Sequence, residues 1–81
     1  MRLDKYLKVS RLIKRRTVAN QACDVGRVSV NGKVVKASYE VKAGDEIEIG
    51  FGGSALRVRV TGLKETVGKS DASTLYEAIE P

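Results

Sequence analysis

The stretch EIEIGFGGSALRVRV, residues 46–60, decides how the second half of this 81-residue chain folds. Isoleucine and valine alternate with charged residues on both sides of a Gly-Gly pair, which is typical of two half-buried strands joined by a tight turn. Folding the stretch about the glycines gives three facing pairs: Ile47 with Val58, Glu48 with Arg57, and Glu46 with Arg59. Because apolar pairs and opposite charges fall into register together, the sequence predicts a hairpin with cross-strand ion pairs.

The segments on either side of this hairpin predict further elements. In RVSVNGKVV, residues 27–35, valines alternate around Asn31-Gly32, a residue pair preferred in type I′ turns, so a second hairpin is expected. Residues 66–73 predict a loop. The final TLYEAIE has a capping box formed by Thr74 and Glu77, which predicts a short closing helix.

Two helices are expected before the strands. Within residues 3–13, apolar side chains recur at steps of three and four and lysine or arginine follows the same steps on the opposite side. The inward positions are Leu3, Tyr6, Leu7, Ser10 and Ile13. A second helix is predicted to begin at Thr17, whose hydroxyl would cap the first turn with Asn20 at the reciprocal position, and to end at Gly26. The expected fold is a single α+β domain over residues 1–81.

Charge is distributed unevenly along the chain. Residues 1–36 carry ten Lys/Arg and two acidic residues, a net charge of +8, whereas residues 37–81 carry five Lys/Arg and eight acidic residues, a net charge of −3. A one-sided basic field is typical of proteins that bind a polyanion, most often a nucleic acid.

The basic charge is concentrated in the first sixteen residues. They contain seven cations and a single acid, Asp4. An ordinary solvated helix face is the alternative interpretation, but such faces usually interleave both signs because paired charges avoid self-repulsion. We therefore expect a phosphate-binding surface, on which the cap at Thr17 would fix the direction of Arg15 and Arg16. Asp4 suits the start of a helix and could also steady a neighbouring arginine.

The aromatic residues help to choose between kinds of nucleic acid. Tyr6, Tyr39, Phe51 and Tyr76 are scattered among apolar positions, so we expect them in the core and not on a base-stacking platform. Binding without stacking favours the shape and backbone of structured RNA, or DNA. A helix-turn-helix that reads adenine with Asn20 or Gln21 is the DNA alternative, but residues 17–25 contain no Lys or Arg and the strands would have no role.

Other classes of function have less support. The chain has no histidine and a single cysteine, Cys23, so we expect a packed thiol, no catalytic site, no metal and no cofactor. Arg57 and Arg59 are expected in ion pairs of the sheet. No apolar run approaches the roughly 20 residues that span a bilayer, and the charged N-terminus is unlike a secretory signal. We expect a cytoplasmic protein.

Several of these residues together resemble a known family. RLDKYL, Arg11, RRTVA, Cys23 followed by Gly26, VSVNG and VKAGDEI are similar, in identity and spacing, to the RNA-binding domain of small-subunit ribosomal protein four, the alpha-L motif. The resemblance covers residues 2–49, with residues 50–81 as a hairpin and C-terminal extension. It implies two short helices packed on a small, strongly bent antiparallel sheet, with the helix pair and the adjoining strand edge facing folded RNA.

The opening MRLDKYLKVSRLIKRRT is also similar to a narrower group of small bacterial proteins, which are related to the small ribosome-binding heat-shock protein and act in ribosome-associated quality control. That resemblance implies a monomer that binds large-subunit rRNA and tRNA on a large ribosomal subunit still carrying peptidyl-tRNA, and that helps a tailing factor add alanine to the stalled chain. A general ribosome-assembly factor is the alternative. The expected RNA-binding residues are Arg2, Lys5, Lys8, Arg11, Lys14, Arg15, Arg16, Asn31 and Lys33.

Overall fold

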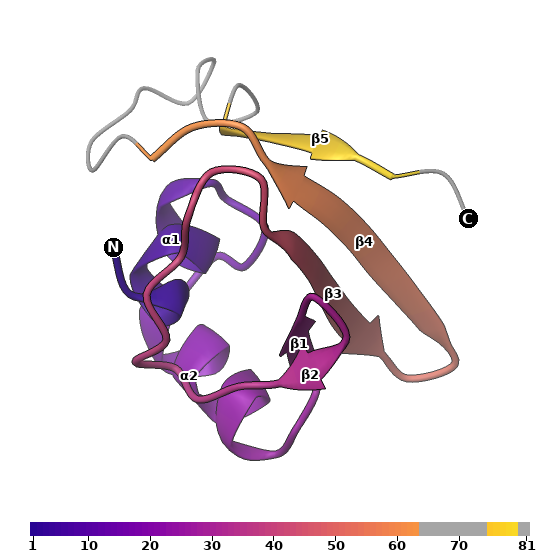
Figure 1. Ribbon diagram of the computed structural model, residues 1–81. Helices are drawn as coiled ribbons and strands as arrows, with labels where there is room; N and C mark the ends of the chain where they lie inside the picture. The colour runs from indigo at the N-terminus through magenta and orange to yellow at the C-terminus, as the bar shows by residue number, and fades with distance from the viewer. Residues whose placement is uncertain (64–74, 80–81) are drawn as a thin grey trace.

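The computed structural model describes residues 1–63 and 75–79, which form two α-helices and a five-stranded antiparallel sheet (Figure 1). The elements in chain order are α1 (Leu3–Val9), α2 (Arg16–Asp24), β1 (Val28–Val30), β2 (Lys33–Val34), β3 (Glu46–Phe51), β4 (Ser54–Val60) and β5 (Tyr76–Ala78). The strand order in the sheet is β2-β1-β3-β4-β5. The expected α+β class is confirmed.

The hairpin of β3 and β4 has the register that the sequence predicts, with all three expected pairs directly opposite one another. The expected ion pairs are present as well. Arg57 lies 3.7 Å from Glu46 and 3.6 Å from Glu48, and Arg59 lies 3.7 Å from Glu46. Arg59 also donates a 2.8 Å hydrogen bond to Glu77 of β5. Acid and base therefore alternate across the outer face of three neighbouring strands.

The turn between β1 and β2 is the predicted type I′ turn, since both of its central residues have positive φ, 52° at Asn31 and 85° at Gly32. The Asn31 side chain also forms two hydrogen bonds within the fold. Its Nδ2 donates to Asp45 at 3.1 Å, and its Oδ1 accepts the backbone N–H of Glu46 at 3.0 Å. Asn31 thereby ties this turn to the beginning of β3.

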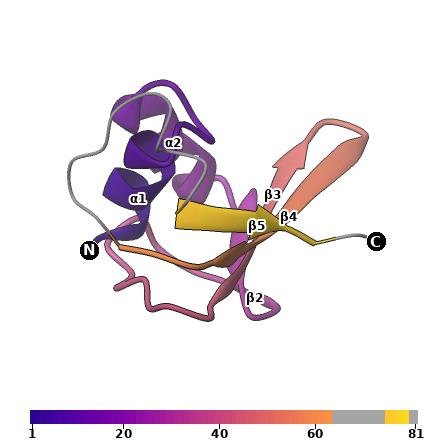
Figure 2. The same cartoon turned by 90° about the horizontal axis from the view of Figure 1, so that it is seen from above.

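The core lies between the helices and one face of the sheet, with both helices on the same side of it (Figure 2). Alternate strand residues point inward, as the alternation in the sequence requires. They are Val28, Val30, Ile47, Ile49, Val58 and Val60, and each is buried. The five positions expected on the inner face of the first helical segment are also all buried, including the polar Ser10.

The first helix is shorter than its apolar pattern, because α1 ends at Val9. Arg11 adopts φ of 62°, a left-handed conformation that turns the chain. The Ser10 hydroxyl donates to the Leu7 carbonyl at 3.3 Å, and the Ile13 N–H reaches the same carbonyl at 3.1 Å. The chain thus leaves the helix while Ile13 still packs into the core.

The start of the second helix differs from the expectation. Helix α2 begins at Arg16, with Arg15 at the N-cap in an extended conformation, and its N-cap makes no side-chain capping hydrogen bond. Thr17 is therefore not the cap, and Asn20 makes no reciprocal bond because its amide is hydrogen-bonded to Asp4 of α1 instead. The predicted end of this helix at Gly26 is confirmed. Gly26 has φ of 78°, and the N–H groups of Gly26 and Arg27 donate to the carbonyls of Cys23 and Ala22 in a Schellman motif.

The expected closing helix is wrong. Residues 76–78 form β5, an edge strand that pairs with β4, and the Ile79 N–H donates to the Arg57 carbonyl at 2.9 Å. This segment gains hydrogen bonds to the free edge of β4 and has a hydrophobic anchor of its own, which together outweigh its helical pattern. The anchor is Leu75, which is buried, and its carbonyl accepts a 2.7 Å hydrogen bond from the Tyr6 hydroxyl. The loop expected over residues 66–73 and the proposed cap at Thr74 lie outside the described residues.

One aromatic residue also departs from the prediction. Tyr6 is fully buried, and Tyr39 and Tyr76 pack against the core, but Phe51 is 48% exposed. Phe51 lies at the end of β3, on the hairpin that extends beyond the helices (Figure 2). The apolar face of β3 therefore continues past the body of the domain, where nothing in the described residues buries it.

The bond between Tyr6 and the Leu75 carbonyl generates a stability prediction. Tyr6→Phe removes one of three donors to the Leu75 carbonyl, which keeps the N–H groups of Thr61 and Gly62, so the free energy of unfolding should fall by about 0.5–1.5 kcal/mol in a urea titration. Tyr76→Phe is the matched control, because no hydrogen bond from the Tyr76 hydroxyl occurs within the described residues. Equal losses in the two variants would contradict this account of how the C-terminal strand is anchored.

Candidate RNA-binding surface

A buried carboxylate organises the surface where the two helices meet. Asp4, in the first turn of α1, is 2% exposed. Arg2 donates to it from Nε and Nη2, each at 3.3 Å, and Arg16 of α2 donates from Nη2 at 3.4 Å. Asn20, one turn further along α2, donates from Nδ2 at 3.3 Å. We call these four residues the Asp4 cluster.

The charge state of Asp4 follows from these contacts. Burial alone would raise the pKa of the carboxyl, and it is the largest single influence. Hydrogen bonds from Asn20, Arg16 and the backbone N–H of Lys5, with the positive charge of Arg16, outweigh burial together and hold the pKa below its ordinary value. Asp4 is therefore ionised at neutral pH and binds both arginines as an anion.

Asp4 holds both arginines, and each arginine side chain is still partly exposed to solvent. The side chains of Arg2 and Arg16 are 47% and 45% exposed, although each touches a carboxylate that is almost wholly buried. A guanidinium carries five N–H donors, and Asp4 uses two from Arg2 and one from Arg16. The remaining donors are available to a ligand on the protein surface. Two planar donor groups held in a set geometry suit phosphate oxygens.

The Asp4 cluster corrects the predicted role of Thr17 and supports the predicted role of Asp4. The direction of Arg16 is set by Asp4 and not by a cap at Thr17, which is exposed in the first turn of α2. The expectation that Asp4 could steady a neighbouring arginine is confirmed for two arginines. Asn20 could not be predicted as a partner of Asp4, because the two residues are sixteen positions apart and only the packing of α1 on α2 brings them into contact.

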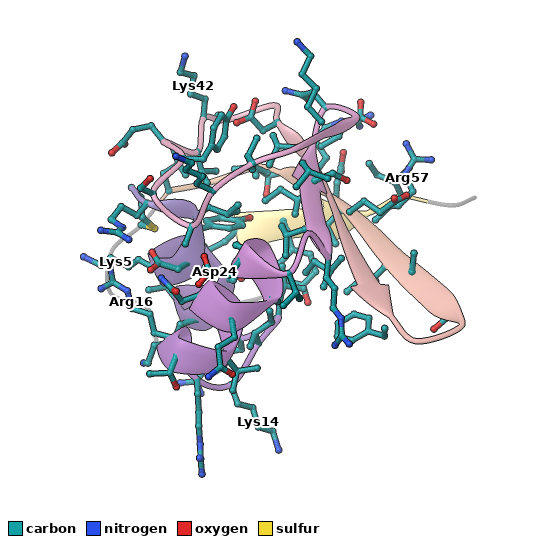
Figure 3. All side chains as sticks on the ribbon, turned by 90° about the horizontal axis from the view of Figure 1, so that it is seen from below. Lys5, Lys14, Arg16, Asp24, Lys42 and Arg57 are labelled. Carbon is teal, nitrogen blue, oxygen red and sulfur yellow. The ribbon has the colours of Figure 1, made fainter. Side chains whose placement is uncertain are left out.

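The other expected binding residues are spread more widely. Lys5 and Arg16 lie on the same side of the molecule, whereas Lys14 projects from one end of it (Figure 3). Lys8, Arg11 and Arg15 are exposed on α1 or on the link between the helices. Asn31 and Lys33 lie at the β1–β2 turn, on the sheet and not on the helices. The structure therefore brings Arg2, Lys5 and Arg16 together around Asp4 and leaves the remaining cations around this centre.

The opposite side of the molecule has a different electrostatic character. Arg57 points away on the side opposite Lys5 and Arg16 (Figure 3), and its charge is met by Glu46 and Glu48. Two arginines and three glutamates share that outer sheet face. The helical side instead carries a surplus of cations around a single buried acid. The two sides thus differ in net charge as the sequence predicts.

Chemistry of other kinds has little support among the described residues. Cys23 is buried, as expected, and burial raises the pKa of its thiol to about 11, so it is a poor nucleophile. In residues 1–63 and 75–79 no group of His, Cys, Asp and Glu side chains could hold a metal ion. Neither described helix is long and apolar enough to cross a membrane.

Comparisons with known proteins agree with this architecture. Residues 1–47 match the family model of the S4 domain. The RQC P-site tRNA stabilizing factor of Halalkalibacterium halodurans is 61% identical over 77 residues, which is 95% of this chain and 88% of that protein. The factor of the same name from Bacillus subtilis is 51% identical over 80 residues, 99% of this chain and 93% of that one. The solved structure of heat shock protein 15 from Vibrio cholerae is 29% identical, has a TM-score of 0.90, and is matched over 98% of this chain and 81% of its own.

The helix pair, the antiparallel sheet and the matched segment define an S4-type domain. The chain belongs to the S4-domain family, and over nearly its whole length it is similar to proteins named RQC P-site tRNA stabilizing factor.

The Asp4 cluster predicts a stability that depends on pH. Because the folded pKa of Asp4 lies below its unfolded value, the carboxylate stabilises the fold above the unfolded value, and this contribution is lost as pH falls through the folded pKa. Asp4→Asn should lower the free energy of unfolding by about 1–3 kcal/mol at pH 7, measured by urea titration. The difference from wild type should narrow as pH falls below 3.8 and through the lower folded pKa, where Asp4 of the folded protein becomes protonated.

The matched control for this experiment is Asp24→Asn. Asp24 is an exposed carboxylate at the end of α2, so its variant should stay within about 0.5 kcal/mol of wild type at pH 7. A gap between Asp4→Asn and wild type that does not change with pH would show that the charge of Asp4 is not what holds the cluster together.

Proposed function

We propose that this protein binds folded ribosomal RNA and tRNA through the surface built around the Asp4 cluster, and that it acts on the ribosome. The observation that carries the proposal is the pair of half-exposed arginines that one buried carboxylate holds in place. A merely solvated face has no need of such an anchor. A ligand that presents phosphates in fixed positions gains from donors that are already oriented, because less side-chain entropy is lost on binding.

Electrostatics supports the same proposal. The first 36 residues carry a net charge of +8, and a polyanion that neutralises this charge relieves the mutual repulsion of the cations. Lys5, Lys8, Lys14, Arg11 and Arg15 would surround the Asp4 cluster with further phosphate contacts. Lys33, at the β1–β2 turn, would extend the contact to the edge of the sheet. The Asn31 side chain is occupied within the fold, so its contribution would be to place Lys33.

The relatives supply the setting for this binding. Their name, RQC P-site tRNA stabilizing factor, places those proteins at a tRNA on the ribosome. We extend that role to this chain, as a cytoplasmic monomer on a large subunit that still carries peptidyl-tRNA, where it contacts both rRNA and tRNA. Its task would be to hold the tRNA while a tailing factor adds alanine to the stalled chain. On this proposal the protein is a binding factor and not an enzyme.

The arginines of the Asp4 cluster should be essential for binding. Arg16→Ala and Arg2→Ala should each reduce co-sedimentation with purified large ribosomal subunits carrying peptidyl-tRNA by roughly tenfold or more, because each removes a charged donor to phosphate. Each should also cost some stability, because Asp4 loses a partner. Circular dichroism and urea titration at the assay temperature would establish that the variants remain folded.

Arg57→Ala provides the matched control, since it removes the same side chain from the opposite side of the molecule. Binding should stay within about twofold of wild type, and the loss of stability should be below about 1 kcal/mol because its ion pairs are half exposed. If Arg57→Ala weakens binding more than Arg16→Ala, the RNA-binding surface is the sheet. Equal binding to empty large subunits and to those with peptidyl-tRNA would favour an assembly factor.

Salt dependence offers an independent test of the number of phosphate contacts. Six to eight contacts should give a slope of about −4 to −7 when the logarithm of the affinity for large subunits is plotted against the logarithm of the salt concentration. Arg15→Ala should reduce the magnitude of the slope by roughly one contact. A slope near zero would exclude phosphate binding as the source of affinity.

A further inference from the structure

A groove beside the Asp4 cluster has no role in the function proposed so far. The chain that leaves β2 runs along α2 towards the start of α1 (Figure 1), and the N–H of Asp4 donates to the Ala37 carbonyl at 3.2 Å. Between this segment and α2 lies a groove of about 480 Å³. That volume falls within the range of sites that hold small organic ligands. Arg2 and Asn20 belong to its lining, so the groove is continuous with the Asp4 cluster.

The charged groups of the groove favour an anion near Arg2. Arg2 and the exposed Lys36 bring two cations to its lining, and Asp24 brings one carboxylate. Arg2 is already oriented by Asp4. Asp24 lies one helical turn beyond Asn20 on α2, outside the Asp4 cluster. A ligand with a single phosphate would therefore be held at the end of the groove that Arg2 occupies.

The apolar part of the groove lies at Val34 and Gly26. Val34 is 64% exposed, and its Cγ1 lies 3.9 Å from the position that a β-carbon on Gly26 would take. Gly26 has no side chain, as its φ of 78° in the Schellman motif requires, so its backbone is open beside Val34. A flat apolar face could lie against this surface and cover Val34. The groove therefore offers a planar base the contact that the scattered aromatic residues do not provide.

Polar groups that could read the edge of a base also line the groove. The Asn20 amide gives one N–H to Asp4, which leaves its second N–H and its oxygen for a ligand. The exposed Ser38 supplies a hydroxyl on the facing segment. An asparagine amide can form two hydrogen bonds with the edge of a base. The phosphate of a nucleotide, the ring of its base and the edge of that base thus each have a matching part of the groove.

We propose that this groove binds one unpaired nucleotide of the RNA, with its phosphate at Arg2 and Lys36 and its base against Val34 and Gly26. This inference rests on the proposed function and deepens it, because it adds a site for a base to a surface otherwise described by phosphate contacts. Bases in loops and bulges of folded RNA are free to leave the stack and enter such sites.

The probes for the test are the four nucleoside 5′-monophosphates, inorganic phosphate and the nucleosides, titrated into the ¹⁵N-labelled protein and followed by NMR. Nucleotides should give saturable shifts at the amides of Gly26 and residues 34–38 and at the Asn20 side chain. Inorganic phosphate should shift only signals near Arg2 and Lys36. Val34→Asp and Lys36→Ala should each weaken nucleotide binding roughly tenfold, while Lys42→Ala, a lysine outside the groove, should leave it unchanged.

Two outcomes would overturn the inference. Nucleotides and inorganic phosphate could bind equally well, which would mean an anion site without a place for the base. Saturable shifts could also be confined to the depression of Arg16, Thr17 and Gln21 on the other side of Asn20. Either result leaves the proposed function standing if large subunits still bind with Arg16-dependent, salt-dependent affinity. Loss of that dependence, with nucleotides still seated in the groove, would instead reject the proposed function.

Discussion

A single buried carboxylate and two arginines connect the fold of this protein to its proposed function. Asp4 is almost fully enclosed where α1 meets α2, and it would be costly there without partners. Arg2 and Arg16 satisfy it from two separate elements and keep nearly half of each side chain exposed. The contact therefore does two things together: it joins the helices, and it fixes the direction in which two cations face the solvent. Stability and ligand binding are coupled at this position, so no substitution there can alter only one of them.

The rest of the molecule supports the contact between Asp4 and the two arginines. The sheet buries its inner valines and isoleucines against the helices, while its outer face alternates glutamate with arginine. Charge on that face is compensated within the protein, and half-exposed pairs of this kind add little stability. Because opposite charges cancel on the outer sheet face, little electrostatic potential remains there to attract a polyanion. On the helical side the cations outnumber the acids, and Asp4 is buried beneath them. The asymmetry gives an approaching RNA a preferred orientation before any contact is made.

Much of the fold could be predicted from local patterns, and the reasons for the failures are physical. The register of the β3–β4 hairpin was predictable because apolar and charged pairs agree on it, and the Asn31-Gly32 turn because few residue pairs accept its dihedral angles. The C-terminal strand was not, because pairing with the edge of β4 overrides a local helical pattern. The candidate surface was predictable only as a concentration of charge along the sequence. Its organisation was not, since the bond between Asn20 and Asp4 depends on how two helices pack and has no signature in spacing.

RNA is expected to meet the exposed ends of Arg2 and Arg16 while their other ends remain bonded to Asp4. A cryo-electron microscopy map of this protein on a large ribosomal subunit carrying peptidyl-tRNA would decide whether it does. We expect density from Arg2 and Arg16 to backbone phosphates of rRNA or tRNA, with the carboxylate of Asp4 still between them and the outer sheet face turned to solvent. A map in which Arg57 and Arg59 face the RNA, while the Asp4 cluster lies away from it, would show instead that RNA binds the sheet.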